Sequence, residues 1–256
     1  MRLVDTHAHL YMGTYRNDRD TVIERSINSG VDKIILPNLK SDTIPEIRDI
    51  TQKYPDHCFA AIGLHPGSVD ETYDEELKVI EDWLQTEQFF AIGETGMDLY
   101  RDDTYKDEQL ASLHHHLQLA YKYNLPLILH QRNAFNEIME SITNANLPGL
   151  RGVFHSFSED LETAQKIIDL GFKIGIGGIV TFKNASLDVV AKEIPLEHII
   201  LETDAPFLTP SPYRGKRNES SYTIYVAKKL AEIKNVSVDE IADVTTQNAH
   251  QLFSLV

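Results

Sequence analysis

Two histidines, His7 and His9, lie two residues apart directly after the first apolar run of the chain, Leu3-Val4. On an extended strand, residues i and i+2 point to the same side, so both imidazoles could reach one ion. Neutral imidazole is the commonest protein ligand for a catalytic divalent metal. A His-x-His pair alone is a weak signal, because two partly exposed histidines near a strand end are an equally good interpretation.

The later sequence favours the metal interpretation. Further residues of metal-ligating type follow later apolar runs, namely His65, Glu94, His130, His155, Glu202 and Asp204. A lone histidine after a strand is more often structural. Five such positions that converge on one edge, together with acidic side chains, would be improbable without a function, and they predict a metal site.

Eight short runs of branched apolar residues could bring these side chains to one edge. They are residues 3–5, 33–37, 59–63, 89–93, 127–129, 152–154, 173–176 and 198–201. Near-continuous apolar runs are typical of strands buried on both faces, as in parallel sheets. Helices are predicted between and after them at residues 18–29, 41–53, 74–85, 106–123, 159–170 and 222–233. Ser158 is expected to cap the helix 159–170, and Ser237 to Glu240 form a capping box that opens a last helix.

Eight alternating units in 256 residues predict an α/β fold, a (β/α)₈ TIM-type barrel in a single domain over residues 1–256. A doubly wound open sheet is the alternative, but no Gly-x-Gly-x-x-Gly follows an early strand. The late segment Gly175-Ile176-Gly177-Gly178 is expected to let the backbone turn at the barrel rim. Functional residues of such barrels lie at the C-terminal ends of the strands, where the candidate ligands are found.

Composition and charge exclude several classes of protein. The net charge of −15 argues against broad attraction to nucleic acid or anionic membranes, although residues 213–218 are locally basic. No apolar stretch approaches the length of a membrane span, and the N-terminus lacks a signal-peptide pattern. The only cysteine, Cys58, excludes an internal disulfide framework and is expected to be a buried structural thiol. We therefore expect a soluble cytoplasmic protein with no membrane partner.

One ion cannot easily use all the candidate ligands, whereas two can share them. His7, His9 and Asp204 would hold the first ion, His130 and His155 the second, and Glu94 would bridge them. No lysine lies at a ligand-bearing strand end, which weighs against a carbamylated-lysine bridge. Two ions about 3.5–4 Å apart can stabilise the attacking and leaving oxygens of a phosphoester displacement. Asp204 could orient the attacking water or take its proton, so Asp204 and Glu94 are the predicted catalytic residues.

The sequence resembles the TatD family of metal-dependent deoxyribonucleases, within the amidohydrolase-like barrels, over essentially its whole length. The resemblance lies in the segments Asp5–His9, Gly63–Pro66, Gly93–Asp98, His130–Ala134, His155–Ser158, Glu202–Pro206 and Arg214–Glu219. It implies a TIM-type barrel and a two-metal phosphodiesterase centre on the ligand positions given above. It also implies Mg²⁺-dependent hydrolysis of ester bonds in DNA, from the 3′ end and with a preference for single strands.

Contacts to substrate are predicted at fewer positions. Arg132 could clamp a phosphate by a bidentate pair, and His65 could also touch phosphate. Arg214 and Lys216 are candidates for contacts to a nucleic acid backbone, whereas Arg217 is equally well a surface charge. Tyr100 and Tyr213 could stack on bases, although isolated aromatic residues near rims are usually packing. Glu202 is expected to orient a metal ligand from behind. His114-His115-His116 resembles a metal tract, but it lies mid-helix and is predicted to be surface and core filler.

The sequence leaves the metal and the substrate open. Histidine nitrogens suit Zn²⁺ or Mn²⁺ better than Mg²⁺, so two divalent ions are predicted without naming the native one. DNA is the expected partner, and no obligate protein partner is implied. The alternatives are a hydrolase of a small-molecule amide, lactone or phosphoester on the same architecture, or a non-catalytic metal-binding barrel. Fold and metals alone would not separate the first of these from a nuclease.

Overall fold

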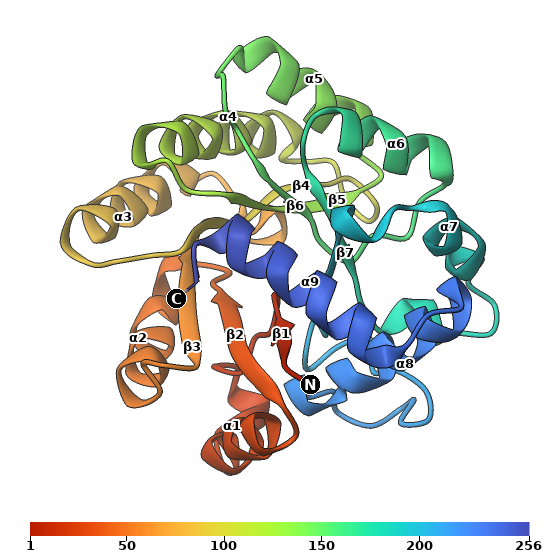
Figure 1. Ribbon diagram of the computed structural model, residues 1–256. Helices are drawn as coiled ribbons and strands as arrows, with labels where there is room; N and C mark the ends of the chain where they lie inside the picture. The colour runs from red at the N-terminus through yellow and green to blue at the C-terminus, as the bar shows by residue number, and fades with distance from the viewer. Residues whose placement is uncertain (256) are drawn as a thin grey trace.

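The computed structural model describes residues 1–255 and shows eight strands alternating with helices (Figure 1). All eight strands are parallel and pair in chain order within one sheet. Their bounds are β1 (Leu3–Asp5), β2 (Val31–Pro37), β3 (Cys58–Ile62), β4 (Ala91–Asp98), β5 (Leu127–Arg132), β6 (Gly152–Phe154), β7 (Lys173–Ile176) and β8 (Ile199–Leu201).

The two edges of this sheet meet just beyond β1 and β8. The backbone amide of Thr6 donates to the carbonyl of Leu201 at 3.0 Å, and Ala8 forms a parallel bridge with Ala205. The sheet therefore curls round into a barrel whose strands all run the same way. The predicted (β/α)₈ barrel in a single domain is confirmed, and the open doubly wound sheet is excluded.

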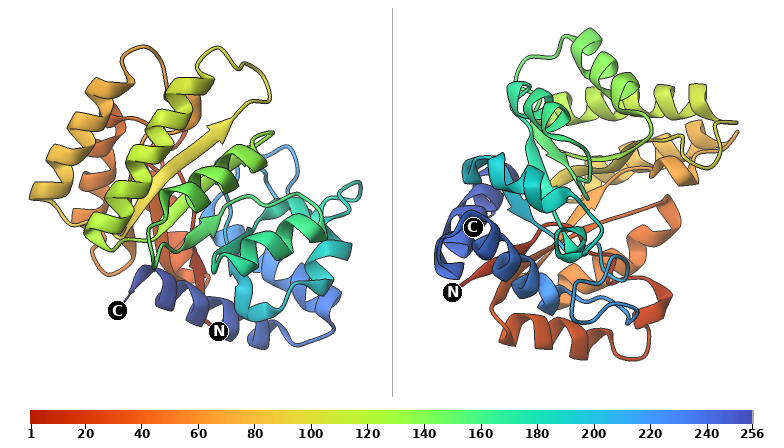
Figure 2. Two further views of the ribbon diagram at one scale, coloured as in Figure 1. Left: turned by 90° about the horizontal axis from the view of Figure 1, so that it is seen from above. Right: turned by 90° about the vertical axis from the view of Figure 1, so that its right-hand side faces the viewer.

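The helices lie outside the strands and surround them (Figure 2). They are α1 (Arg19–Asn28), α2 (Ile44–Lys53), α3 (Tyr73–Thr86), α4 (Lys106–Tyr123), α5 (Phe135–Ala145), α6 (Leu161–Asp169), α7 (Leu187–Glu193), α8 (Thr223–Lys234) and α9 (Val238–Phe253). The predicted cap of α6 at Ser158 is wrong: the carboxylate of Asp160 accepts from the Thr163 amide at 2.8 Å. Ser237 does cap α9, accepting from the Glu240 amide at 3.1 Å. Among residues 1–255, no helix is both long and apolar enough to cross a bilayer.

The core has an outer and an inner layer because neighbouring residues of each strand point to opposite faces. On β2, for example, Ile34 and Leu36 pack outward among the helices, whereas Ile35 points into the barrel. The inner residues pack against Leu252 and Phe253 of α9, which closes the N-terminal end of the barrel (Figure 1). The opposite, C-terminal end is left for the functional site.

The single thiol belongs to the packed interior. Cys58 at the start of β3 is 2% exposed, and burial raises its pKa to about 12. A thiol that stays protonated at neutral pH is a poor nucleophile and a poor metal ligand. The prediction of a buried structural cysteine is confirmed.

Strands β4 and β5 extend further than predicted. β4 runs to Asp98 instead of ending at residue 93, and β5 runs to Arg132 instead of residue 129. The two extensions pair with each other, with Gly96 opposite His130 and Asp98 opposite Arg132. Consequently Glu94 and His130 lie within strands, and Glu94 shares a face with Asp98, which the sequence had not marked as a candidate.

Candidate metal centre

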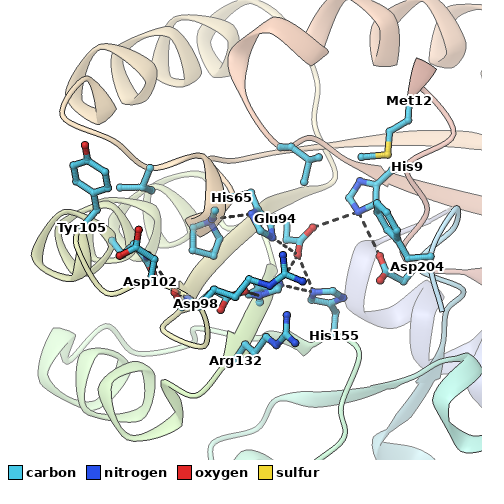
Figure 3. Close-up of a pocket in the computed structure, with 18 residues that line it drawn as sticks. His9, Met12, His65, Glu94, Asp98, Asp102, Tyr105, Arg132, His155 and Asp204 are labelled. Atoms are coloured by element: carbon cyan, nitrogen blue, oxygen red, sulfur yellow. Dashed lines mark hydrogen bonds and ion pairs between the residues drawn. The ribbon is translucent and has the colours of Figure 1, made fainter. Parts of the chain in front are cut away.

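A cavity of about 760 Å³ opens at the C-terminal end of the barrel and is called the central cavity below (Figure 3). Its walls come from the ends of several strands and the loops that follow them. The predicted site residues that line it are His9, His65, Glu94, His130, Arg132, His155 and Asp204. The other predicted ligand, His7, is fully buried directly behind His9 and Glu94.

One group of donor atoms gathers on the β1 and β8 side of the central cavity. His7 Nε2 lies 3.1 Å from His9 Nε2 and 3.1 Å from Glu94 Oε2. Asp204 Oδ1 lies 3.5 Å from His9 Nε2 and 3.8 Å from His7 Nε2. Residues that follow β1, lie in β4 and follow β8 thus bring one nitrogen or oxygen atom each into the same region of the cavity.

A second group gathers on the other oxygen of Glu94. Glu94 Oε1 lies 2.8 Å from His155 Nε2, 2.9 Å from His130 Nδ1 and 3.3 Å from His65 Nε2. His130 Nδ1 and His155 Nε2 are 3.3 Å apart. The Glu94 carboxylate therefore faces one donor group with each of its oxygens, which is the position a bridging ligand needs.

The separations between these donor atoms match those of ligands around a divalent ion. Two ligands at 2.0–2.2 Å from a tetrahedral ion lie about 3.3–3.6 Å apart, close to the separations seen here. The buried oxygen Glu94 Oε2 has no hydrogen-bond partner in the part of the chain that the structure describes. An unpaired buried carboxylate oxygen is costly unless a cation satisfies it. The residue set therefore suits the metal ions that the sequence predicted.

Hydrogen bonds set the ring tautomers of two of the imidazoles. His9 Nδ1 lies 3.1 Å from the Pro37 carbonyl and 2.9 Å from the Tyr11 hydroxyl, which itself donates to that carbonyl at 2.9 Å. With the hydroxyl proton so used, Nδ1 carries the ring proton and Nε2 presents its lone pair. On the far side of His130, Nε2 lies 3.2 Å from Asp98 Oδ2, which leaves Nδ1 free for a metal. Partners of this kind fix the orientation of a metal-binding histidine and increase its basicity.

Asp98 is the functional residue that sequence reasoning missed. The signal was the two-residue spacing of Glu94, Gly96 and Asp98, which becomes informative only once β4 is known to continue to Asp98. Its carboxylate also accepts from the Tyr100 amide at 3.0 Å, so it is held in place beside His130. We assign Asp98 the role of orienting His130.

Replacing Asp98 with asparagine should lower metal affinity at the second donor group by about 10- to 100-fold. The amide keeps the size of the side chain but removes the charge that stabilises the His130 Nε2 proton. Metal titration monitored by calorimetry or by a competing chelator measures the change. Asp102→Asn is a suitable control, because Asp102 also lines the cavity but bonds to Thr104. Equal affinity in wild type and Asp98→Asn would contradict the assignment.

His65 differs from the other imidazoles in its tautomer. Its Nδ1 accepts from the Gly67 amide at 2.9 Å, so the neutral ring carries its proton on Nε2, which faces Glu94 and the cavity. A protonated nitrogen is a hydrogen-bond donor and not a metal ligand. His65 is therefore arranged to donate a hydrogen bond to an anionic group in the cavity.

A buried histidine of α4 supports the loop that carries His65. His116 Nδ1 donates to the Ser112 carbonyl at 2.7 Å, and its Nε2 accepts from the Leu64 amide at 3.1 Å. His114 is exposed and His115 half-buried, so the predicted surface and core filler is confirmed for the tract as a whole. His116 has the additional role of fixing Leu64, next to His65.

The His116 contact should make stability depend on pH. Burial lowers the pKa of His116 from 6.5 to about 4, so the unfolded chain takes up a proton first as the pH falls. The neutral His116 contributes its full stabilisation above pH 6.5, and this contribution is lost progressively as the pH falls to about 4. The free energy of unfolding of the wild type, relative to that of His116→Leu, should therefore fall by about 2 kcal/mol from pH 7.5 to pH 5. Urea denaturation of both proteins at several pH values measures it, and a constant difference would contradict the prediction.

The electrostatics of the cluster keep the bridging carboxylate charged. Burial acts to raise the pKa of Glu94, but the imidazoles of His155, His65 and His7 outweigh it and hold that pKa well below its ordinary value. Burial acts to lower the pKa of His155, yet Glu94 and Glu202 raise it well above its ordinary value. Burial lowers the pKa of His7. Glu94 is thus an anion, and a metal has to displace the proton of His155.

Glu202 lies behind the ligands, as its predicted orienting role requires. Glu202 Oε1 accepts from the Ser156 amide at 2.5 Å and lies 3.8 Å from His155 Nδ1. Gly175 of β7 makes room for this side chain, because a Cβ at that position would collide with the Glu202 carboxylate. Gly175 therefore serves the site directly, whereas Gly178 in the turn after β7 makes room for the backbone of Leu208.

A buried contact between the first and last strands positions Asp204. Thr203 donates to the Asp5 carboxylate from its backbone amide at 2.9 Å and from its hydroxyl at 2.6 Å. The Asp204 amide donates to the His7 carbonyl at 2.9 Å. The carboxylate of Asp204 is thereby held over His7 and His9, although these residues are nearly 200 positions away in the sequence.

The basic residues predicted to contact substrate separate into two groups. Arg132 lines the central cavity, and its guanidinium carbon lies 3.9 Å from the centre of the Tyr100 ring. Arg214 packs over Phe182 at 3.6 Å and does not line the central cavity, and neither does Lys216. Arg217 is paired with the Asp18 carboxylate at 2.5 Å, which favours its interpretation as a structural surface charge. Only Arg132 of this set is placed to meet a group bound at the metal centre.

Comparison with known proteins shows that the chain is similar to metal-dependent hydrolases of one family. A family model described as TatD related DNase matches residues 4–254. The uncharacterized metal-dependent hydrolase YabD of Bacillus subtilis is 39% identical over 254 residues, covering 99% of each chain. The uncharacterized metal-dependent hydrolase YjjV of Escherichia coli is 34% identical and covers 99% of this chain and 98% of its own. The crystal structure of YjjV, a TatD homologue, aligns with a TM-score of 0.93 over 100% of this chain and 99% of its own.

Proposed function

The chain belongs to the TatD related DNase family of metal-dependent hydrolases, and from this premise we propose that it hydrolyses phosphodiester bonds in DNA. The observation that carries the proposal is the Glu94 carboxylate, which faces one group of donors with each of its oxygens. A pair of ions bridged in this way suits displacement at phosphorus, because both the attacking and the leaving oxygen need stabilisation.

The ions would be held by the two donor groups described above. His7, His9 and Asp204 would hold one ion, His130 and His155 the other, and Glu94 would touch both. When bound, the ions supply positive charge at the phosphoryl oxygens and a water that ionises near neutral pH. The nitrogen-rich donor set favours Zn²⁺ or Mn²⁺ over Mg²⁺, which prefers oxygen ligands.

The remaining roles fall to side chains at the cavity wall. Asp204 is 15% exposed at its side chain and is placed to accept a proton from the attacking water. Arg132, stacked on Tyr100, would donate from its guanidinium N–H groups to phosphate oxygens. His65 holds its Nε2 proton toward the cavity and can donate it in a hydrogen bond to a non-bridging oxygen.

The depth of the site supports a single strand or strand end as substrate. Glu94 is 2% exposed and His7 is fully buried, so the reacting phosphate has to enter the central cavity. A flexible single strand can thread a phosphate into such a cavity, whereas the backbone of a rigid duplex lies against a broader surface. We propose shortening of single strands from the 3′ end.

The test is cleavage of a single-stranded DNA oligonucleotide labelled at its 5′ end, with Mg²⁺, Mn²⁺ or Zn²⁺ and with EDTA. A ladder that shortens from the 3′ end with metal, and is absent with EDTA or in Glu94→Gln, is the expected result. Absence of cleavage with every metal, in folded protein shown to contain metal, would overturn the proposal. Turnover of small phosphoesters, lactones or amides by that same protein would then identify the alternative hydrolase.

A further inference from the structure

The central cavity changes chemical character from one side to the other. Beyond Asp98 the wall carries polar and charged side chains, including Asp102 and Arg132. On the side of His9 and Asp204 the wall is apolar and includes Met12, which Figure 3 shows next to His9. The aromatic ring of Phe207 belongs to the same apolar side, with its centre 6.3 Å from that of His9.

The backbone of Phe207 is held by hydrogen bonds although the residue is 50% exposed. Its amide donates to the Asp204 carbonyl at 2.8 Å, and its carbonyl accepts from Asn218 Nδ2 at 2.6 Å. The same buried Asn218 amide group donates to the Thr203 carbonyl at 2.8 Å. The turn that carries the metal-ligand candidate Asp204 therefore also fixes the backbone that presents an exposed aromatic residue three positions later.

Phe207 and Met12 also line a neighbouring hollow on this side of the central cavity. A second hollow of about 570 Å³ shares both residues with the central cavity. Its other lining residues are Gly13, Thr14, Pro206 and Arg217. A strand that extends from the metal centre toward this hollow would therefore lie against Phe207 and Met12.

We propose that Phe207, together with Met12, is a stacking platform for an unpaired nucleobase next to the phosphodiester at the metal centre. The inference rests on the proposed function and identifies which part of the strand this wall receives. A phosphate would gain nothing from an apolar wall beside the Asp204 carboxylate, whereas every base has a flat face that stacks on an aromatic ring. The thioether of Met12 adds a polarizable contact to the base.

The platform gives a physical reason to prefer single strands. In a duplex both faces of an internal base are covered by its neighbours, so only an unpaired or terminal base can lie on Phe207. A half-exposed ring loses little on binding because its backbone is already fixed by Asn218. The platform selects for an accessible base and not for a particular base, since no polar side chain is part of it.

The test compares Phe207→Ala and Phe207→Trp with wild type on 5′-labelled single strands. One strand is intact, and three others carry a single abasic residue at one of the last three 3′ positions. On the intact strand Phe207→Ala should lower kcat/KM by about 5- to 100-fold, mainly through KM, and Phe207→Trp should restore it. One abasic position should lower wild-type kcat/KM similarly, with no further loss in Phe207→Ala. Tyr121→Ala, which removes an equally exposed ring on α4, is the control and should match wild type.

The outcomes separate this inference from the proposed function. Cleavage of the intact strand at the same rate by wild type and Phe207→Ala would overturn the platform and leave the nuclease standing. Equal losses in Phe207→Ala on intact and on all abasic strands would also overturn it, because the ring would then act only through the Asp204 turn. If wild type cleaves no strand with any metal, the nuclease proposal fails and the platform falls with it.

Discussion

Replacing Glu94 with glutamine is expected to reduce DNA hydrolysis by about a thousandfold and to lower the amount of metal that the protein retains. Glutamine has nearly the same shape, but it is neutral and offers a single oxygen. Glu94 Oε2 faces His7 and His9, and Glu94 Oε1 faces His130 and His155, so one substitution disturbs both donor groups. Loss of one preorganised electrostatic contact at a reacting centre commonly costs 10²–10³ in rate, and this residue serves two ions.

Metal content by mass spectrometry and single-strand cleavage would be measured on the same preparation. Glu162→Gln is the matched control, because Glu162 is 77% exposed at its side chain on α6 and pairs with Lys166, away from the cavity. It should retain wild-type activity and metal. A Glu94→Gln enzyme that keeps a full complement of metal and more than about a tenth of the activity would contradict the bridging role.

The location of the donor residues could be predicted from the sequence because the barrel topology decides where each strand ends. In a parallel barrel every strand delivers its C-terminal end to one face, so His7, His155 and Asp204 could be grouped without any knowledge of distances. The rule needs only the order of apolar runs. All eight runs correspond to strands, and all seven predicted helices correspond to helices of the structure.

The ends of strands were harder to predict because pairing decides them. Residues 95–98, Thr-Gly-Met-Asp, lack the branched apolar pattern of a strand. They are extended because β5 continues beside them, and the Leu99 amide still donates to the Arg132 carbonyl at 2.9 Å. A contact between segments more than 30 residues apart leaves no local signal. Asp98 therefore escaped notice although its neighbour Glu94 did not.

Two helices escaped prediction for a related reason. The residue before α5 is Ala134, whose side chain cannot cap a helix, and α7 spans only Leu187–Glu193. Ser186 does precede α7, but Val189 stands where the Glu of a capping box would be, as Glu240 is for Ser237 in α9. Their apolar residues, such as Ile138 and Leu187, are buried against the barrel, so tertiary packing stabilises them.

The basic segment after β8 shows what charge alone does not reveal. Arg214, Lys216 and Arg217 have the right sign for a nucleic acid partner, but the direction of each side chain depends on distant residues. Arg217 pairs with Asp18, which lies near the other end of the sequence. Arg132, alone in an otherwise neutral stretch, is the arginine of this set that lines the cavity. Proximity to the donors, and not local charge density, distinguishes it.

Replacing Asp204 with asparagine is expected to lower kcat by about 10²- to 10⁴-fold, the range for loss of a general base. Asparagine keeps an oxygen that can face an ion, but it cannot accept a proton from water. The backbone should tolerate the change, because Asp204 has a φ of 57° and asparagine is among the residues that adopt this left-handed conformation readily.

The pH profile and the metal content separate the role of base from that of ligand. If Asp204 accepts the proton, the variant should keep at least part of its metal, lose most of its kcat, and regain rate as hydroxide rises above neutral pH. Asp102→Asn, which alters a carboxylate elsewhere on the cavity wall, should behave as wild type. Complete loss of metal in Asp204→Asn would make Asp204 essential as a ligand. A metal-loaded variant with unchanged kcat would exclude it as the base and leave Glu94 as the one carboxylate among the donor atoms that could serve.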